Sequence, residues 1–451
     1  MADADLVIRN GTVVQPHELA LSHDIAVTDG SIAAVGPNLP LTGVSEIDAS
    51  GLHVFPGGVD PHVHFNEPGR AGWEGIATGS QALARGGFTT YVDMPLNCSP
   101  VTVDVDAFDQ KLCAANASSL VDFGFWGGLV PGKLSNVEPL LRRGVLGFKA
   151  FMCESGIADF PAADDLTLWE GMRRCAELGS LVLVHAENAA LVTELTKRAA
   201  EAGCDRPRDF AATRPVMAEV EAISRALFFA GETGCAVHVV HVSTARGVQL
   251  VERAREAGVD ASCETCPHYL LLTEDDLDEL GAAAKCAPPL RSTSDREALW
   301  ELIGKGRLRI VASDHSPCPP ELKEREDFFQ AWGGISGCQT TLQLLLAHGH
   351  TRRRLALPTL AGLVATNPAQ RIGLPAKGAA EAGKDADLVL IDLADEWPLS
   401  AGELEYRHRQ TPFVGWPIRG RVLRTLVRGN TVVAGGKVAS PPLGRLVTRA
   451  T

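Results

Sequence analysis

Apolar and polar positions follow two different patterns along this chain. Both ends carry short apolar runs with the alternation typical of strands, at residues 6–14, 24–27, 31–36, 387–391 and 422–433. Asn10-Gly11 and Asp29-Gly30 are dipeptides typical of hairpin turns. Because chain ends often lie close in space, we predict that residues 1–53 and 379–451 form one small β-sandwich domain.

Between the two ends, apolar strand-like runs alternate with segments of helical pattern. Eight such runs occur, at residues 52–65, 87–95, 121–129, 145–152, 180–187, 235–244, 260–270 and 309–317. Helix-compatible patterns separate them, for example at 167–178 and 219–229. Eight alternations within one stretch favour a closed barrel over an open sheet. We therefore predict an α/β fold with a (β/α)₈ TIM barrel over residues 54–378.

Polar side chains that can bind metal stand at the ends of five of these runs. His62 and His64 follow the first run, and strand alternation turns both imidazoles to one face. Further candidates close the fourth, fifth, sixth and eighth runs: Lys149, His185, His241 and Asp314. The carboxyl ends of barrel strands carry the active site in enzymes of this architecture. The pattern therefore indicates a hydrolytic metal site.

Six candidate ligands are too many for one tetrahedral catalytic zinc, so we expect two divalent ions. Zinc is the first choice, with cobalt, manganese or iron also compatible with imidazole and carboxylate ligands. A lysine condensed with carbon dioxide becomes a carbamate whose oxygens bridge two ions, which is the role expected of Lys149 as carboxylysine. A structural ion pair is the alternative for this lysine. Asp314 is the expected general base and acid, acting on a bridging hydroxide.

Composition narrows the function class without naming a substrate. The formal charge is −13 and no Lys/Arg stripe is evident, which argues against a nucleic-acid surface. No apolar run reaches the length of a membrane span, and the first residues lack signal-peptide features. The eleven cysteines show no disulfide-framework spacing, so Cys263 and Cys266 are interpreted as structural thiols. These features predict a cytoplasmic location.

Several segments together resemble the cyclic amidohydrolases, the group of the amidohydrolase superfamily that contains dihydroorotases, hydantoinases and allantoinases. The resemblance covers essentially the whole chain and is greatest to allantoinases. The segments that carry it are 64–75, 93–97, 264–270, 285–290, 313–318 and 331–337. It implies a two-metal site on His62, His64, Lys149, His185, His241 and Asp314. The implied reaction opens the ring of allantoin to give allantoate in purine breakdown, and the implied assembly is a homotetramer.

Four further residues are candidate substrate contacts. Asn97 ends the second strand and is suited to a ureido group, although a turn-capping role fits equally. Cys286, Gly334 and Ile335 are positioned in loops that present backbone amides and carbonyls to a ring. The segment from Cys318 to Trp332 is interpreted either as a lid or as a solvated loop.

Two positions separate the related activities. Dihydroorotases resembling this chain have an arginine where Asn66 stands, and a buried carboxylate needs such a cation, although Arg70 is a possible substitute. Hydantoinases have a tyrosine where Glu154 stands. Hydantoinase/dihydropyrimidinase or dihydroorotase activity remains the enzyme alternative, and a non-catalytic scaffold of the same fold is the other. His238 and His315 are expected to face away from the metals.

Overall fold

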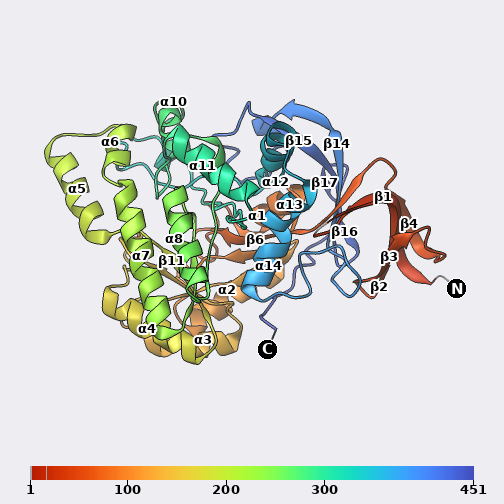
Figure 1. Cartoon of the computed structure of the whole chain (residues 1–451), viewed down its shortest axis with the longest axis horizontal. Helices are drawn as coiled ribbons and strands as arrows, with labels where there is room; N and C mark the ends of the chain where they lie inside the picture. The colour runs from red at the N-terminus through yellow and green to blue at the C-terminus, as the bar shows by residue number, and fades with distance from the viewer. Residues whose placement is uncertain (1–2, 17, 451) are drawn as a thin grey trace.

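The computed structural model describes residues 3–16 and 18–450, and strands from both chain ends share one sheet (Figure 1). Its nine strands run in the order β17-β16-β15-β14-β5-β1-β2-β3, with β4 paired to β1. Their bounds are β1 Ala4–Val14, β2 Leu19–Thr28, β3 Ser31–Pro37, β4 Gly43–Asp48, β5 His53–Pro56, β14 Leu388–Pro398, β15 Pro417–Val427, β16 Asn430–Ala434 and β17 Lys437–Val438.

The central strand pair joins the two ends of the chain. β5 runs parallel to β1 and antiparallel to β14, with Val54 opposite Leu390. Ile8, Ile25 and Leu426 bury their side chains completely in the core of this sheet. The prediction of one β domain from both ends is therefore confirmed. The predicted run 52–65 divides into two strands, and the proposed boundary between residues 53 and 54 falls inside β5.

The Asn10-Gly11 turn prediction is wrong. Both residues lie inside β1, where the register with β2 shifts between Ile8 and Gly11. Asn10 has φ 61° and its amide donates to Asp24 Oδ1 at 2.9 Å, so this dipeptide forms a bulge. Asp29-Gly30 forms the turn between β2 and β3, as predicted.

Parallel strands form the barrel that follows the N-terminal part of the sheet. They are β6 Gly58–Val63, β7 Phe88–Asp93, β8 Asp122–Phe125, β9 Gly127–Gly128, β10 Phe148–Phe151, β11 Leu181–His185, β12 Ala236–Val239 and β13 Ala261–Cys263. The eighth predicted run, 309–317, is not a continuous strand. Bridges of Val311 to Thr265 and of His315 to Val63 close the barrel there. The seventh run is shorter than predicted, because a helix begins at Pro267.

Helices surround the barrel strands (Figure 1). The longer ones are α1 Ile76–Arg85, α2 Val105–Ser118, α3 Val137–Arg143, α4 Asp165–Glu177, α5 Ala189–Glu201, α7 Val216–Thr233, α8 Ala245–Glu256 and α11 Thr293–Gly304. The short ones are α6 Pro207–Ala212, α9 Pro267–Leu271, α10 Leu277–Leu280, α12 Thr341–Leu345, α13 Leu357–Ala361 and α14 Asn367–Ile372. The predicted helices at 167–178 and 219–229 correspond to α4 and α7. The predicted (β/α)₈ barrel is confirmed.

A buried charge cluster ties the barrel to the β domain. The Nζ atom of Lys377 donates to Asp122, at the start of β8, at 2.6 Å and to Asp387, beside β14, at 2.8 Å. Asp385 lies 2.8 Å from the same atom. Burial by itself would lower the pKa of Lys377. The three carboxylates have the larger effect, so the pKa of Lys377 is raised. The ammonium thus occupies the centre of three acidic groups.

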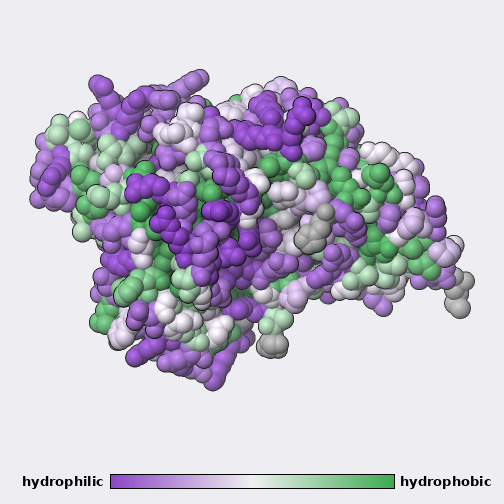
Figure 2. All heavy atoms as spheres, viewed as in Figure 1, coloured by the Kyte–Doolittle hydropathy of each residue, from purple (hydrophilic) through white to green (hydrophobic). Residues whose placement is uncertain are grey.

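The surface view mixes hydrophilic and hydrophobic side chains, with hydrophobic patches over the β domain at the right of Figure 2. Exposed apolar residues of this domain include Leu21 and Val44. Among residues 3–16 and 18–450, no helix combines the length and apolar character that crossing a membrane requires.

Candidate metal centre

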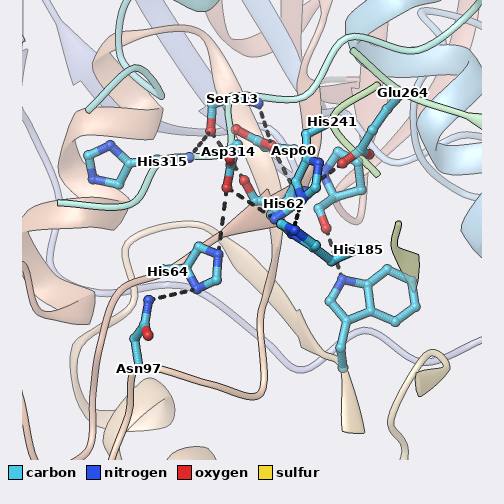
Figure 3. Close-up of polar contacts among 12 residues, drawn as sticks. Asp60, His62, His64, Asn97, His185, His241, Glu264, Ser313, Asp314 and His315 are labelled. Atoms are coloured by element: carbon cyan, nitrogen blue, oxygen red, sulfur yellow. Dashed lines mark hydrogen bonds and ion pairs between the residues drawn. The ribbon is translucent and has the colours of Figure 1, made fainter. Parts of the chain in front are cut away.

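The six predicted ligands come from five strand ends of the barrel. His62 lies in β6 and His64 directly follows it, Lys149 lies in β10, and His185 ends β11. His241 follows β12 by two residues, and Asp314 lies between the bridging residues Val311 and His315. Figure 3 shows the four histidines and Asp314 turned toward one another. The structure therefore brings together residues that are far apart in the sequence.

Two of these residues have a strained backbone. His241 has φ 41° and Asp314 has φ 45°, in the left-handed region that non-glycine residues rarely adopt. Such conformations persist only where the surrounding structure holds them, and they are concentrated at functional sites. Here they turn both side chains toward the other ligands just after their strands end.

His62, His64 and Asp314 form the tightest group. Asp314 Oδ1 lies 3.1 Å from His62 Nε2 and 3.6 Å from His64 Nε2. One donor atom from each of the three lies within 4.8 Å of the others, and all three residues are buried. This spacing fits a shared cation.

His185 and His241 form the second group. His185 Nδ1 lies 3.0 Å from His241 Nε2. The other ring nitrogen of His185 contacts Glu187 Oε2 at 2.8 Å, and Arg214 donates to the same carboxylate oxygen at 2.8 Å. Burial lowers the pKa of His185 and lowers that of His241 further, so both rings are neutral and suited to bind metal.

Lys149 lies beside these rings without a hydrogen-bond partner. Its side chain is fully enclosed and, among the described residues, its Nζ contacts no acceptor. Burial lowers the pKa of Lys149 to about 7, although the carboxylates of Asp314 and Glu264 oppose this shift. The nearby lysine also helps to lower the pKa of His62, after burial itself. An unpaired amine at this position is consistent with a group that is modified or bound to metal in the working protein.

Glu264 supports the ligands from behind and was not predicted as a site residue. Its Oε1 lies 2.6 Å from His62 Nδ1, and its Oε2 lies 3.1 Å from His238 Nε2. Burial raises the pKa of Glu264 to about 8, against the effect of Lys149. A carboxylate on the distal nitrogen of a ligating histidine fixes its tautomer and orientation. The signal in the sequence was a lone acid that follows an apolar strand.

The two histidines expected to face away behave differently. His315 does so: its Nδ1 accepts from the Gly337 amide at 3.2 Å, and Figure 3 shows its ring turned from the cluster. His238 is also absent from the cavity lining, but it shares Glu264 with His62 and therefore lies behind the candidate ligands. Strand alternation does not extend from His238 to His241, because β12 ends at Val239.

A cavity of about 340 Å³ opens over the ligands. Asn97, Cys286 and Gly334 line it, whereas Ile335 does not and instead bridges to His315. Asn97 Nδ2 donates to His64 Nδ1 at 3.4 Å. Three of the four candidate substrate contacts thus face the cavity.

Arg70 and Asn66 both lie outside the lining of this cavity. The guanidinium of Arg70 stacks on Trp73 at 5.0 Å, and Asn66 Nδ2 donates to the Pro317 carbonyl at 3.3 Å. The cations that line the cavity are Arg214 and Lys285, and Arg214 is paired with Glu187. Arg70 therefore offers no counter-charge to a carboxylate bound there.

The residues fit a metal centre. Imidazole nitrogens and a carboxylate converge from different strands, and Lys149 has no competing partner. Neutral imidazoles and a carboxylate oxygen suit zinc, cobalt, manganese or iron. His62, His64 and Asp314 form one group that could hold an ion, and His185 and His241 lie beside it.

Comparisons with known proteins agree with this geometry. The model of the "Amidohydrolase family" matches residues 53–432. The allantoinase of Rubrobacter xylanophilus is 55% identical over 99% of this chain and 98% of its own, and that of Solibacter usitatus is 50% identical over 98% and 97%. The L-hydantoinase (dihydropyrimidinase) of Arthrobacter aurescens is 36% identical, with a TM-score of 0.96 over 100% of both chains. With this match over most of its length, the chain belongs to the amidohydrolase family and is a cyclic amidohydrolase.

Proposed function

We propose that this protein hydrolyses the cyclic amide of allantoin to allantoate. The observation that carries the proposal is the similarity to allantoinases over nearly the whole chain, at 55% identity to the Rubrobacter enzyme. The buried ligand cluster beneath the cavity supplies matching chemistry. Water adds to a ring carbonyl and the C–N bond then breaks. The ring opens to a chain that carries a carboxylate at one end and the NH₂ group of a ureido group at the other.

His62, His64, Lys149, His185, His241 and Asp314 would hold two divalent ions, with Lys149 carboxylated. Two such ions lower the pKa of water toward about 7 and polarise the amide carbonyl. The low pKa of Lys149 favours the neutral amine that reacts with carbon dioxide. The neutral histidines are ready to bind without losing a proton.

Asp314 is the residue that moves the proton. Its carboxylate faces the cavity floor, 3.1 Å from His62 Nε2. It accepts a proton from the attacking water and returns it to the leaving ring nitrogen. Asn97, beside His64, is positioned to hold a ureido carbonyl through its amide. The loop residues Cys286 and Gly334 border the ring from the opposite wall.

The cavity favours a neutral ring over an anionic one. A carboxylate that enters must lose its hydration, and Arg214 is already neutralised by Glu187. Lys285 directs its ammonium toward backbone carbonyls rather than toward the cavity centre. The carboxylate of dihydroorotate therefore has no free cationic partner in the cavity. Allantoin is neutral and needs only hydrogen bonds.

Hydantoinase activity is the second candidate, favoured by the similarity to the Arthrobacter L-hydantoinase. Against it stands Glu154, a cavity residue at the position where hydantoinases carry a tyrosine. A carboxylate at this wall suits the polar ureido group of allantoin better than an apolar hydantoin substituent.

The test is a product assay with metal-loaded protein on allantoin, hydantoin and dihydroorotate. We expect kcat/KM for allantoin to exceed that for dihydroorotate at least about a hundredfold, which corresponds to about 2.7 kcal/mol. Equal rates on the two would overturn the substrate assignment. A preference for hydantoin would leave the metal chemistry intact and replace the substrate.

Metal content is a separate measurement. Elemental analysis of protein produced with zinc, cobalt or manganese should approach two ions per chain. Full activity at one ion per chain would overturn the two-metal proposal. Assembly as a tetramer stays a prediction from the family resemblance, and a cytoplasmic location stays a prediction from the sequence.

A further inference from the structure

One wall of the cavity has no regular secondary structure. The wall segment, residues 328–334, contributes six consecutive lining residues from Phe329 to Gly334. It contains neither helix nor strand and consists of turns and irregular backbone. Its position must therefore come from contacts with other parts of the chain.

Lys285 supplies three of these contacts. Its buried Nζ donates to the carbonyls of Phe328 at 2.7 Å, Phe329 at 3.1 Å and Ala331 at 2.6 Å. The amide of Gly334 donates back to the Lys285 carbonyl at 2.7 Å. The lysine thus binds the wall segment at both of its ends.

Lys323 repeats the arrangement from the other side. Its Nζ donates to the carbonyl of Ala282 at 2.8 Å and to that of Gly334 at 2.6 Å. Ala282 lies three residues before Lys285 in the same loop. Lys285 and Lys323 therefore both connect residues 281–286 with the wall segment.

Neither lysine has a carboxylate partner among the described residues, since both form side-chain bonds only to carbonyls. Burial lowers the pKa of Lys285 to about 7 and that of Lys323 to about 8, but the three carbonyls around Lys285 Nζ match the three N–H donors of its charged form. The rings of Phe210 and Phe328 lie 4.6 Å and 5.1 Å from Lys285 Nζ, which adds cation–π attraction. Burying a charge without an opposite charge is costly, and a fold that needed only packing would use an apolar side chain here. Three converging carbonyls instead specify one geometry of the wall segment.

We propose that Lys285 and Lys323 are positioning residues that clamp the wall segment and thereby set substrate affinity. Lys285 itself borders the cavity together with Cys286, so the clamp also aligns the loop opposite the metal ligands. Loosening it leaves His62, His64 and Asp314 untouched, because none of them contacts either lysine. The affinity claim rests on the proposed reaction, whereas the clamp itself is a property of the fold.

The experiment compares Lys285→Met and Lys323→Met with the wild-type holoenzyme. Lys305→Met is the matched control, since Lys305 is an exposed lysine of the α11 C-cap that pairs only with Glu301. The first readout is the rate of trypsin cleavage after Arg325, an exposed residue just before the wall segment. The second is kcat and KM for allantoin, with metal content measured in parallel.

We expect Lys285→Met to raise Arg325 cleavage and KM each at least about tenfold, with metal content unchanged and kcat reduced less than KM is raised. Lys323→Met should act in the same direction, and Lys323→Arg should recover most of the loss because it keeps charge and donors. If Lys285→Met does not fold, Lys323→Met and Lys323→Arg carry the test.

Cleavage and KM within about twofold of wild type in the folded variants would overturn the proposal, as would a loss confined to kcat or metal. Absence of allantoin hydrolysis in the wild type would overturn the proposed function only, because the cleavage comparison would still decide whether the clamp exists.

Discussion

His62 Nδ1 lies 2.6 Å from Glu264 Oε1, so the ring that faces Asp314 is held from its far side. When Nε2 of this ring binds a cation, its proton must reside on Nδ1, and Glu264 is the acceptor placed to receive that hydrogen bond. The same carboxyl group contacts His238, which is held in turn by Ser262 Oγ at 2.7 Å. One acid therefore connects a metal-ligand candidate to the barrel interior.

Replacing this acid should weaken metal binding without removing a ligand. Glu264→Gln keeps the size of the side chain but replaces one of the two oxygens that contact His62 and His238 with an amide nitrogen, which cannot accept a hydrogen bond. We expect metal affinity to fall about 10–100-fold, as measured by competition with a chelator. Glu256→Gln, at an exposed position of α8, is the control. An unchanged metal affinity would mean that Glu264 contributes to packing alone and does not orient His62.

Lys149→Ala should abolish metal binding and activity together. The buried amine has no other hydrogen-bond partner among the described residues, so its removal leaves the rest of the fold intact. Short carboxylic acids at high concentration should restore part of both, because they offer the two oxygens that the carbamate would provide. Retention of both ions by the variant would contradict the proposed role.

Carboxylation of Lys149 in metal-stripped protein should depend on pH. Its pKa is lowered to about 7, chiefly by burial, so the reactive neutral amine is the minority form at pH 6 and the majority form at pH 8. At fixed dissolved carbon dioxide, the rate of carbamate formation should rise about tenfold over this range. His62 and His241, whose pKa values lie well below 6.5, stay neutral throughout.

The measurement is carbamate detection by carbon-13 NMR with labelled bicarbonate, and Lys149→Ala is the blank. A rate that rose about a hundredfold from pH 6 to pH 8, without levelling off near pH 8, would show an amine with an ordinary pKa.

Lys377→Met should destabilise the protein strongly. The substitution leaves Asp122, Asp385 and Asp387 close together without the ammonium that now separates them. Removing one partner of a buried ionic group costs about 3–5 kcal/mol. Urea unfolding should show this loss, and Lys197→Met, which removes an exposed lysine of α5, should not. A loss below about 1 kcal/mol would mean that the carboxyl groups become neutral instead.

The sequence predicts the barrel well, and it predicts which side chains converge at one end of it, because both depend on local alternation. His62 and His64 share a face through strand periodicity, and His185 ends its strand as expected. Sequence patterns do not reveal which buried acid contacts a histidine from behind, so the contact of Glu264 with His62 and His238 was not predicted. His241 and Asp314 reach the cluster through left-handed backbone that no local pattern indicated.

The wall of the cavity was still less predictable. The interpretation of residues 318–332 as lid or solvated loop stayed open, because the segment has few apolar positions of its own. In the structure, bonds from Lys285, more than forty positions away, hold it in place. Long-range contacts of side chains with backbone leave no periodic trace in a sequence.

The pairing of β5 with β14 also sets an order of events during synthesis. Strands β1 to β5 emerge from the ribosome first, yet the edge of β5 has no partner until Leu388 and the rest of β14 have been made. The whole barrel must leave the exit tunnel in between. The N-terminal strands therefore wait with an open edge, which is a surface for a chaperone or for aggregation. Completion of this sheet is therefore a late step that closes the molecule.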